Sequence, residues 1–217
     1  MTTTVGVVEP RQARSRESLA RVLDAAADLL VERGDDSLTI AEVSARSRVS
    51  VGSIYARFDG KNAIVRAVQQ REMDRIDGQT ARAFDDAVRA ERGLEANVRS
   101  LVAARVTLLA EEAPILSALM RSAHHDPSLV ARGRESALLA QRCFVAALTR
   151  AVAQLGSPPS AARVEWCDEL VHSLASRHLG LGVGVHFEPD RSFSVPELID
   201  ELTSTVLALL PDAGTQG

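Results

Sequence analysis

Residues 39–58 read TIAEVSARSRVSVGSIYARF, and this stretch contains two helix starts close together. Thr39 and Glu42 have the spacing of a capping box, in which the Thr39 hydroxyl accepts from the amide of Glu42 and the Glu42 carboxylate accepts from the amide of Thr39. Ser50 is a second good N-cap residue, and only residues 47–49 separate the two short helices. Two short helices joined by a tight turn predict a helix-turn-helix unit.

The second of these helices, expected over residues 51–58, has an inner and an outer face. Ile54 and Phe58 lie four residues apart, so we expect both to pack inward, against Leu23, Leu30 and Val43. A helix-turn-helix binds DNA by placing its second helix in the major groove. Near the start of this helix, Gly52 lets the backbone approach a surface closely. The side chains left on the outer face are those of Val51, Gly52, Ser53, Ala56 and Arg57.

Helical periodicity continues along almost the whole chain, and no segment shows the two-residue alternation of a half-buried strand. We therefore predict an all-α fold with about nine helices. The first helix is expected over residues 15–33, with Gly34 as its C-terminal stop. Beyond the helix-turn-helix unit, helices are expected from residue 61 onward and at 93–112, 114–123, 127–155, 160–180 and 195–210, with Pro114 separating two of them.

Composition limits the class of protein. The chain has 217 residues, of which 46% are hydrophobic, enough for a substantial core. Cys143 and Cys167 form no C-x-x-C pair, so we interpret them as small core residues of a protein in a reducing compartment. Neither a signal peptide nor a long apolar segment is found, which predicts a soluble, cytoplasmic protein with no membrane partner. The net charge of −4 does not by itself indicate a nucleic-acid partner.

Catalytic and metal-binding patterns are missing from the sequence. We find no Ser/His/Asp set, paired carboxylates, phosphate-binding glycine loop or H-E-x-x-H motif, so we expect no enzyme activity and no cofactor. The run His124-His125-Asp126 has the composition of a metal site. However, adjacent helical residues point about 100° apart, and Asp126 is expected to cap the helix that starts at Pro127, so we predict no metal there.

The segment from Leu29 to Ala67 resembles the DNA-binding domain of the TetR family of regulators. The resemblance implies a three-helix helix-turn-helix head followed by a larger helical domain that binds a ligand and dimerises. We accordingly divide the chain into a disordered arm (1–13), a DNA-binding domain (14–60), a ligand-binding and dimerisation domain (61–210) and a disordered tail (211–217). The matching residues are Gly34, Thr39, Ile40, Val43, Ala45, Val49, Ser50, Gly52, Ile54, Tyr55, Phe58 and Lys61.

By this resemblance, phosphate contacts are implied for Ser50, Tyr55, Arg57 and Lys61, and Arg14 or Arg16 would reach the flanking backbone. Base edges would meet Val51, Gly52 and Ser53, and Thr39 and Arg48 complete the expected DNA-contacting set. The alternatives are that Tyr55 and Phe58 are core residues and that Arg57 and Lys61 are solvated charges. Two departures stand out: Arg48 occupies the place of a turn glycine, and Asp59-Gly60 puts an anion near the DNA, for which we expect weaker or more salt-sensitive binding.

A ligand pocket between the helices at 93–112, 114–123, 127–155 and 160–180 is implied by the same resemblance. These helices are rich in small apolar side chains, which predicts a mostly hydrophobic effector, including one that bears a carboxylate or an acyl group. The alternative for each polar candidate is an ordinary surface position. The expected lining residues are Arg105, Met120, Arg121, His124, Gln141, Phe144, Trp166 and His172.

The leading hypothesis is a ligand-responsive repressor that binds operator DNA as a homodimer. The rival is an architectural or activating DNA-binding protein without a ligand, and such a protein would be expected to carry more positive charge. We expect the dimer to form through the helices at 160–180 and 195–210. The apolar residues that suggested this interface are Leu198, Ile199, Leu202, Val206, Leu209 and Leu210.

Overall fold

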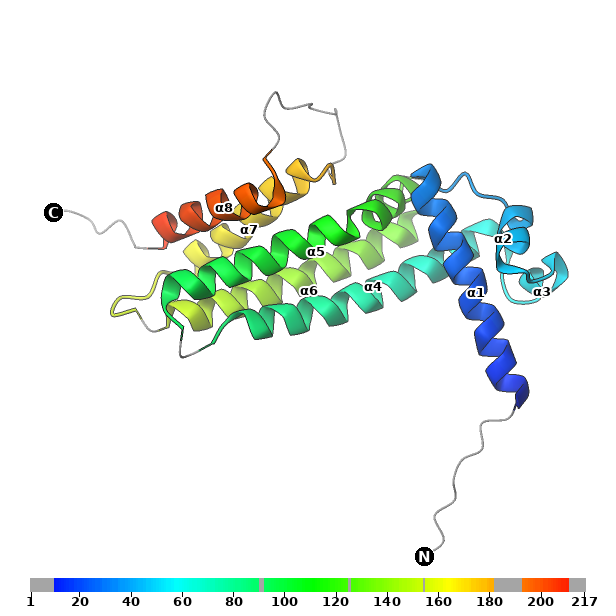
Figure 1. Ribbon diagram of the computed structural model, residues 1–217, viewed down its shortest axis with the longest axis horizontal. Coiled ribbons are helices and arrows are strands. Elements are labelled where there is room, and N and C mark those ends of the chain that lie inside the picture. Colours follow the sequence, from blue (N-terminus) through cyan, green and yellow to red (C-terminus); the bar gives the residue numbers. More distant parts are fainter. Residues whose placement is uncertain (1–9, 90–91, 125, 154, 182–192, 211–217) are drawn as a thin grey trace, which may run out of the picture.

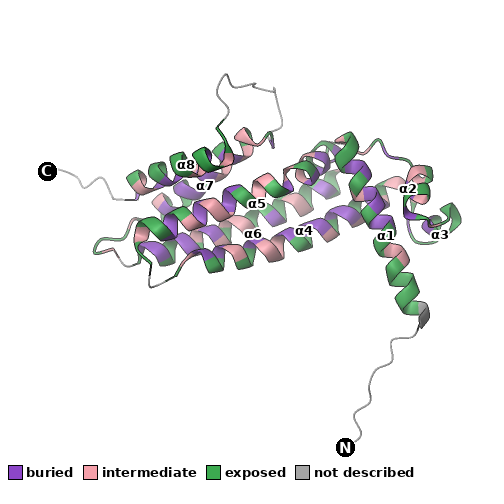
Figure 2. Cartoon of the chain, in the orientation of Figure 1, coloured by how far each residue is buried: buried purple, intermediate pink, exposed green. Residues whose placement is uncertain are grey.

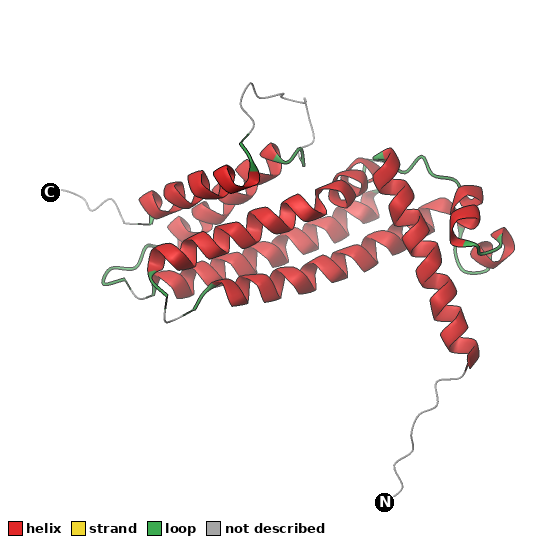
Figure 3. Cartoon of the chain, viewed as in Figure 1, coloured by secondary structure: helices red, strands yellow, loops and turns green. Residues whose placement is uncertain are grey.

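The computed structural model describes residues 10–89, 92–124, 126–153, 155–181 and 193–210, and all the regular structure in them is helical (Figure 3). The prediction of an all-α fold is therefore confirmed. Eight helices are present in these residues: α1 (Pro10–Arg33), α2 (Ile40–Ser47), α3 (Val51–Tyr55), α4 (Gly60–Ala87), α5 (Leu94–Ser122), α6 (Pro127–Val152), α7 (Ala161–His178) and α8 (Val195–Leu209).

Local capping interactions set the end of α1 and the starts of α2 and α3. Gly34 ends α1 with φ +74°, a left-handed conformation that suits glycine. The capping box of Thr39 and Glu42 is formed at the start of α2, and the Ser50 hydroxyl accepts from the amide of Ser53 (3.2 Å) at the start of α3. The predicted helix-turn-helix unit is therefore present. Its second helix is shorter than expected, because the regular part of α3 ends at Tyr55 and a turn leads on to Phe58.

Helix α5 corrects the expectation of two helices separated at Pro114. The helix continues through this proline, and its ribbon changes direction in the last turns, close to α1 (Figure 1). A proline inside a helix removes one backbone hydrogen bond and bends the axis without always ending the helix. Here both halves of α5 bury apolar residues, such as Val106 and Leu119, so packing keeps the second half helical. One continuous helix is the reason why eight helices are described instead of nine.

Three long helices, α4, α5 and α6, run side by side and connect the two ends of the molecule (Figure 1). At one end, α1 packs on α4 and α5, α2 packs on α1, and α3 packs on α2. At the other end, α7 packs on α5 and α6, and α8 packs on α5. Figure 2 shows that the first turns of α1 extend away from this body, and residues 12–17 within them are exposed. Helix α1 includes residues 10–13, which were assigned to the disordered arm, whereas residues 1–9 and 211–217 lie outside the described part.

Two hydrophobic clusters form the core. The first joins Leu30, Val43 and Ile54 of the N-terminal helices to residues of α4 and α5 such as Met73 and Leu119. The second lies at the far end, where α4, α5 and α6 meet α7 and α8. The N-terminal helices therefore share their core with the long helices. In the described residues, no helix combines the length and the apolar character that a bilayer crossing requires.

Candidate functional site

The outer face of α3 is exposed to solvent, as the helix-turn-helix prediction requires. Ile54 is fully buried and Phe58 is 9% exposed, which confirms that these two side chains point inward. Val51 is 41% exposed and Tyr55 is 58% exposed, so Tyr55 is not a core residue. A Cβ atom added to Gly52 would meet nothing within 4 Å, so the start of α3 presents an open surface.

The two cations expected to contact phosphates already have partners within the chain. The Arg57 guanidinium donates to the carbonyl oxygen (2.8 Å) and to the hydroxyl (2.9 Å) of Ser15, which ties the end of α3 to α1. The Lys61 ammonium donates to the carbonyl oxygen of Asp36 (2.7 Å) and pairs with its carboxylate (3.1 Å). These bonds could not be predicted from residue patterns, because Ser15 and Asp36 are distant along the chain from Arg57 and Lys61. Both cations nonetheless remain partly exposed.

The remaining residues of the expected DNA-contacting set divide into exposed and capping positions. Arg14 and Arg48 are exposed, and neither side chain has a hydrogen bond or ion pair recorded within the described residues. Thr39 and Ser50 both serve as N-caps, and the Ser50 hydroxyl also lies 2.8 Å from that of Ser53. These exposed residues, with Arg57 and Lys61, lie on or next to the helix-turn-helix unit.

Arg48 occupies the turn between α2 and α3 in a left-handed conformation, with φ 55° and ψ 33°. This conformation costs an L-residue about 1–2 kcal/mol, and glycine avoids that cost while losing more chain entropy on folding. We expect Arg48→Gly to raise the free energy of unfolding by about 0.5–1 kcal/mol, measured by urea denaturation. The matched control is Ala45→Gly, at an exposed right-handed position in α2, which should lower it by about 1 kcal/mol. Destabilisation by both substitutions would contradict this account.

A cavity of about 610 Å³ lies between α4, α5, α6 and α7. Four of the expected lining residues, Arg105, Met120, His124 and His172, border this cavity. Helix α4 also lines the cavity, which was not expected from the sequence. The three- and four-residue spacing of its lining residues would have indicated this face. The lining residues of α4 are Gln69, Met73, Ile76, Thr80 and Phe84.

The other four expected ligand residues lie elsewhere. Arg121 is exposed and donates from its Nε to the carbonyl oxygen of Gly34, so it connects α5 to the end of α1. Phe144 is buried behind the cavity wall, with its ring edge-on to Phe84 at a centroid distance of 5.7 Å. Trp166 is 52% exposed on α7, and Gln141 is half-buried on α6. None of these four side chains lines the cavity.

A buried ion pair stands at one end of the cavity. Arg105 is 4% exposed and Asp168 is 2% exposed, and Nη2 of Arg105 donates to the Asp168 carboxylate at 2.7 Å. The guanidinium carbon also lies 5.6 Å from the ring centre of Phe84 and 5.5 Å from that of Phe144. The Nε atom of Arg105 is buried and has no hydrogen-bond partner among the described residues.

Burial shifts the pKa values of two neighbouring groups in opposite directions. It raises the pKa of Asp168 to about 6, against the opposing effect of the Arg105 charge, so the carboxylate is ionised at neutral pH. Burial and the Arg105 charge together lower the pKa of His172 to about 4, so its imidazole is neutral. At neutral pH this end of the cavity therefore holds one positive and one negative charge, already paired with each other.

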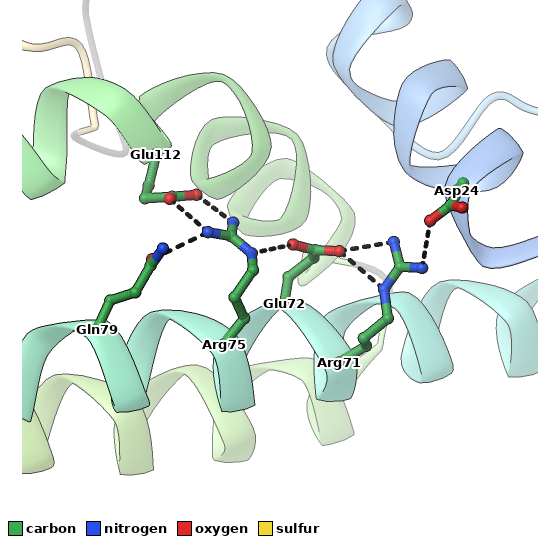
Figure 4. Close-up of polar contacts among 6 residues, drawn as sticks. All are labelled: Asp24, Arg71, Glu72, Arg75, Gln79 and Glu112. Atoms are coloured by element: carbon green, nitrogen blue, oxygen red, sulfur yellow. Dashed lines mark hydrogen bonds and ion pairs between the residues drawn. The ribbon is translucent and has the colours of Figure 1, made fainter. Parts of the chain in front are cut away.

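A chain of ion pairs joins the cavity wall to α1 (Figure 4). Glu112 borders the cavity, and its carboxylate accepts two hydrogen bonds from Arg75 of α4, one of them at 2.7 Å. Arg75 also donates to Glu72 (2.9 Å), Glu72 accepts from Arg71 (2.7 Å), and Arg71 donates to Asp24 of α1 (2.6 Å). These hydrogen bonds raise the pKa of Arg75. These ion pairs therefore connect α1, α4 and α5.

The run His124-His125-Asp126 is not organised as a metal site in the described residues. Asp126 caps α6 by accepting from the amide of Ser128 (3.0 Å), as predicted, and it also pairs with Arg66 (2.7 Å). His125 lies outside the described residues. Within them, no group of three or more potential ligands comes together.

The chain has a helix-turn-helix unit with an exposed α3 and a helical body with a cavity. These two features are typical of a two-part DNA-binding protein. Residues 22–68 match the family model described as bacterial regulatory proteins, tetR family. The resemblance to the TetR family seen in the sequence is therefore confirmed over this N-terminal segment. That family and the relatives named below are transcriptional regulators and not enzymes.

Curated relatives match about a third of the chain. The HTH-type transcriptional repressor Rv3405c of Mycobacterium tuberculosis is 36% identical over 69 residues, which are 31% of this chain and 37% of the relative. The chain therefore spans little more than a third of the curated relatives that it matches.

Solved structures agree over nearly the whole chain. A TetR-family regulator from Mesorhizobium loti has a TM-score of 0.72 at 15% identity, covering 93% of this chain and 97% of that one. The fatty acid degradation regulator FadR from Bacillus halodurans has a TM-score of 0.61 at 14% identity, covering 92% and 96%. At such identities the comparison shows a shared fold.

Proposed function

We propose that the protein is a transcriptional repressor that binds operator DNA as a homodimer and is released by a small, mostly apolar molecule. The observation that carries the DNA-binding part is the open outer face of α3, with Val51 and Tyr55 exposed beside Gly52 and with Ile54 anchored beneath. Outward side chains at the start of such a helix can meet base edges, and the cations around it can hold phosphates.

The first test concerns phosphate contacts. We expect Arg57→Ala and Lys61→Ala each to weaken binding to all DNA sequences and to lower the slope of log affinity against log salt by about one. Their contacts with Ser15 and Asp36 mean that stability will fall too, but a purely structural role would leave the salt slope unchanged. DNA titration by fluorescence anisotropy at several salt concentrations measures both quantities.

Two further sets of variants complete this experiment. Arg150→Ala is the matched control, because Arg150 is an exposed arginine paired with Asp85 at the far end of α4. Substitution of Val51 or Ser53 should instead change which bases are preferred. An Arg57→Ala, Lys61→Ala double variant with unchanged affinity and salt slope would disprove the assignment of these contacts.

The dimer is supported by exposed apolar side chains on α7. Trp166 and Leu174 are 52% and 47% exposed, and Leu170 is half-buried between them, so residues at four-residue steps form one apolar stripe. The apolar residues of α8 were expected to face a second copy. Four of them are instead buried within the chain itself, which corrects that expectation in part: Leu198, Leu202, Val206 and Leu210. Packing of the α7 stripe and its α8 neighbours against a second copy would bury this surface.

Release by a ligand is supported by the position of the cavity between the two ends of the molecule. Met73, Ile76, Leu119 and Leu129 line the cavity and also belong to the cluster that contains the apolar residues of α1, α2 and α3. A ligand that displaces these side chains acts on the core beneath the helix-turn-helix unit. A ligand shifts the equilibrium only if it binds the DNA-free arrangement better than the DNA-bound one.

The ion-pair chain of Figure 4 provides a specific test of this coupling. We expect Glu112→Gln, which removes the charge that holds Arg75, to change the ligand-induced loss of operator affinity by about five-fold. Operator titrations with and without a saturating apolar ligand measure this ratio. The Arg150→Ala variant should leave it unchanged. Equal ratios in wild type and Glu112→Gln would exclude this route.

A further inference from the structure

We propose that the cavity selects uncharged, elongated apolar molecules that carry a carbonyl-type acceptor oxygen, and that Arg105 is the residue that recognises this oxygen. The proposal rests on the assignment of the cavity as the effector site and names the chemical class that it accepts. Ketones, esters, lactones and amides belong to this class, whereas carboxylic acids, which were included in the expectation from sequence, do not.

The first step is the free hydrogen-bonding capacity of Arg105. A guanidinium has five N–H donors, and the recorded hydrogen bond to Asp168 uses one of them. The Nε donor is buried without a partner among the described residues, and Arg105 itself borders the cavity. A buried donor left without an acceptor costs about 1–3 kcal/mol, so an acceptor that reaches the guanidinium of Arg105 from the cavity is favourable.

Three other polar groups of the wall already have partners. Gln69 donates to the carbonyl oxygen of Leu129 at 2.7 Å, the Ser136 hydroxyl donates to Asp77, and Glu112 is held by Arg75. Among the described residues, Nε of Arg105 is the buried side-chain nitrogen or oxygen atom that has no hydrogen-bond partner. An acceptor on the ligand has its most favourable position at this end of the cavity.

Charge then decides between a neutral and an anionic acceptor. The positive charge of Arg105 is already balanced by the carboxylate of Asp168 at 2.7 Å. A ligand carboxylate would place a second anion beside the buried carboxylate of Asp168, and an uncompensated buried charge costs several kcal/mol. A carbonyl oxygen accepts the same hydrogen bond without adding charge, and the neutral imidazole of His172 supplies no extra cation.

The shape of the cavity favours an elongated molecule. Its lining runs along α4 from Gln69 to Phe84, a distance of about 22 Å at 1.5 Å per residue. Its volume of 610 Å³ corresponds to roughly 20 non-hydrogen atoms at about 30 Å³ each. A chain of a dozen carbons with a carbonyl group at one end fits both dimensions.

Arg134 offers an anion a different position, since this exposed cation borders the cavity on α6. Exposed ion pairs contribute only about 0–1 kcal/mol, so Arg134 adds little to the affinity of an acid whose carboxylate lies there. An acid that binds through Arg134 would lose affinity in the Arg134→Ala variant. A neutral ligand held by Arg105 would not.

The test compares ligands that differ only at the acceptor. Dodecanoate, its methyl ester, a methyl ketone of the same chain length and dodecane are titrated into the full-length protein without DNA, at neutral pH and below micellar concentrations. Calorimetry and thermal shift give the affinities. We expect the ester and the ketone each to bind with an affinity at least about ten-fold higher than that of dodecanoate or dodecane. Tighter binding of dodecanoate, or no binding by any of the four, would overturn the proposal.

A variant then tests the role assigned to the ion pair. Asp168→Asn removes the balancing charge, so the preference should shift by about ten-fold or more towards dodecanoate. Arg150→Ala, which lies outside the cavity lining, is the control and should leave the ratio unchanged. If Asp168→Asn fails to fold, the wild-type comparison still decides. Operator release is measured separately: an ester that binds without releasing DNA contradicts the proposed function and leaves this inference intact.

Discussion

The substitution Leu174→Glu is expected to convert the proposed dimer into a monomer and to lower operator affinity by a factor of about 10²–10⁴. Leu174 is 47% exposed on the same stripe of α7 as Trp166, and a charge buried in an apolar interface without a partner is strongly unfavourable. A monomer presents one recognition helix, so it loses the gain that comes from binding two linked half-sites.

Light scattering on the eluted protein and operator titration with full-site and half-site DNA measure the two effects. Leu138→Glu is the matched control, because Leu138 is 42% exposed on α6 and does not line the cavity. The control should remain dimeric with unchanged affinity. A Leu174→Glu protein that stays dimeric, or a monomer with full operator affinity, would rule out this interface.

The second large effect is expected at the buried ion pair. Asp168→Ala leaves the Arg105 charge in the interior without a counterion, and the breaking of such pairs costs about 3–5 kcal/mol. Replacement of both residues, as in Arg105→Met with Asp168→Leu, should cost much less, because no unpaired charge remains. Urea denaturation of the single and double variants measures the difference. A double variant less stable than Asp168→Ala would contradict this explanation.

The pH dependence of stability tests the pKa shifts of Asp168 and His172 independently. The pKa of Asp168 is raised to about 6 in the folded chain, so the proton favours the folded state and stability falls as the pH rises from about 4 to about 6. The pKa of His172 is lowered to about 4, so its contribution has the opposite sign and is lost as the pH falls from about 6.5 to about 4. The charges around these two groups are those of Arg105 and Glu169.

These two slopes offset each other in the wild type and can be separated by substitution. Relative to wild type, His172→Gln should lose stability as the pH rises through this range, because only the Asp168 contribution remains. Asp168→Asn should gain stability over the same range. Parallel pH profiles for all three proteins would show that neither group has a shifted pKa.

The helix-turn-helix unit could be predicted from sequence because its signals are local. The capping box at Thr39, the N-cap at Ser50 and the inward spacing of Ile54 and Phe58 all depend on residues within a few positions of one another. The bonds from Arg57 to Ser15 and from Lys61 to Asp36 span long stretches of chain, and a pattern of residue types does not contain them.

The cavity, too, could be predicted only in those features that depend on local sequence. Its apolar character follows from composition, and Arg105 and His172 were found as polar interruptions of apolar helices. Phe144 and Trp166 were wrongly placed on its wall because a large side chain on a helix can face the core, the cavity or the solvent, and only the packing of neighbouring helices decides. The continuity of α5 through Pro114 has the same cause, since burial of both halves outweighs the local preference for a break.

The core shared by the N-terminal helices and the long helices limits how this protein can be engineered. An isolated fragment of residues 10–59 would expose the faces of Leu30 and Val43 that lie in one cluster with Met73 and Leu119. An exchange of DNA specificity with another protein of the family should therefore move the first half of α4 and the last turns of α5 together with α1, α2 and α3. A junction placed directly before Gly60 would join two surfaces that were never selected to fit each other.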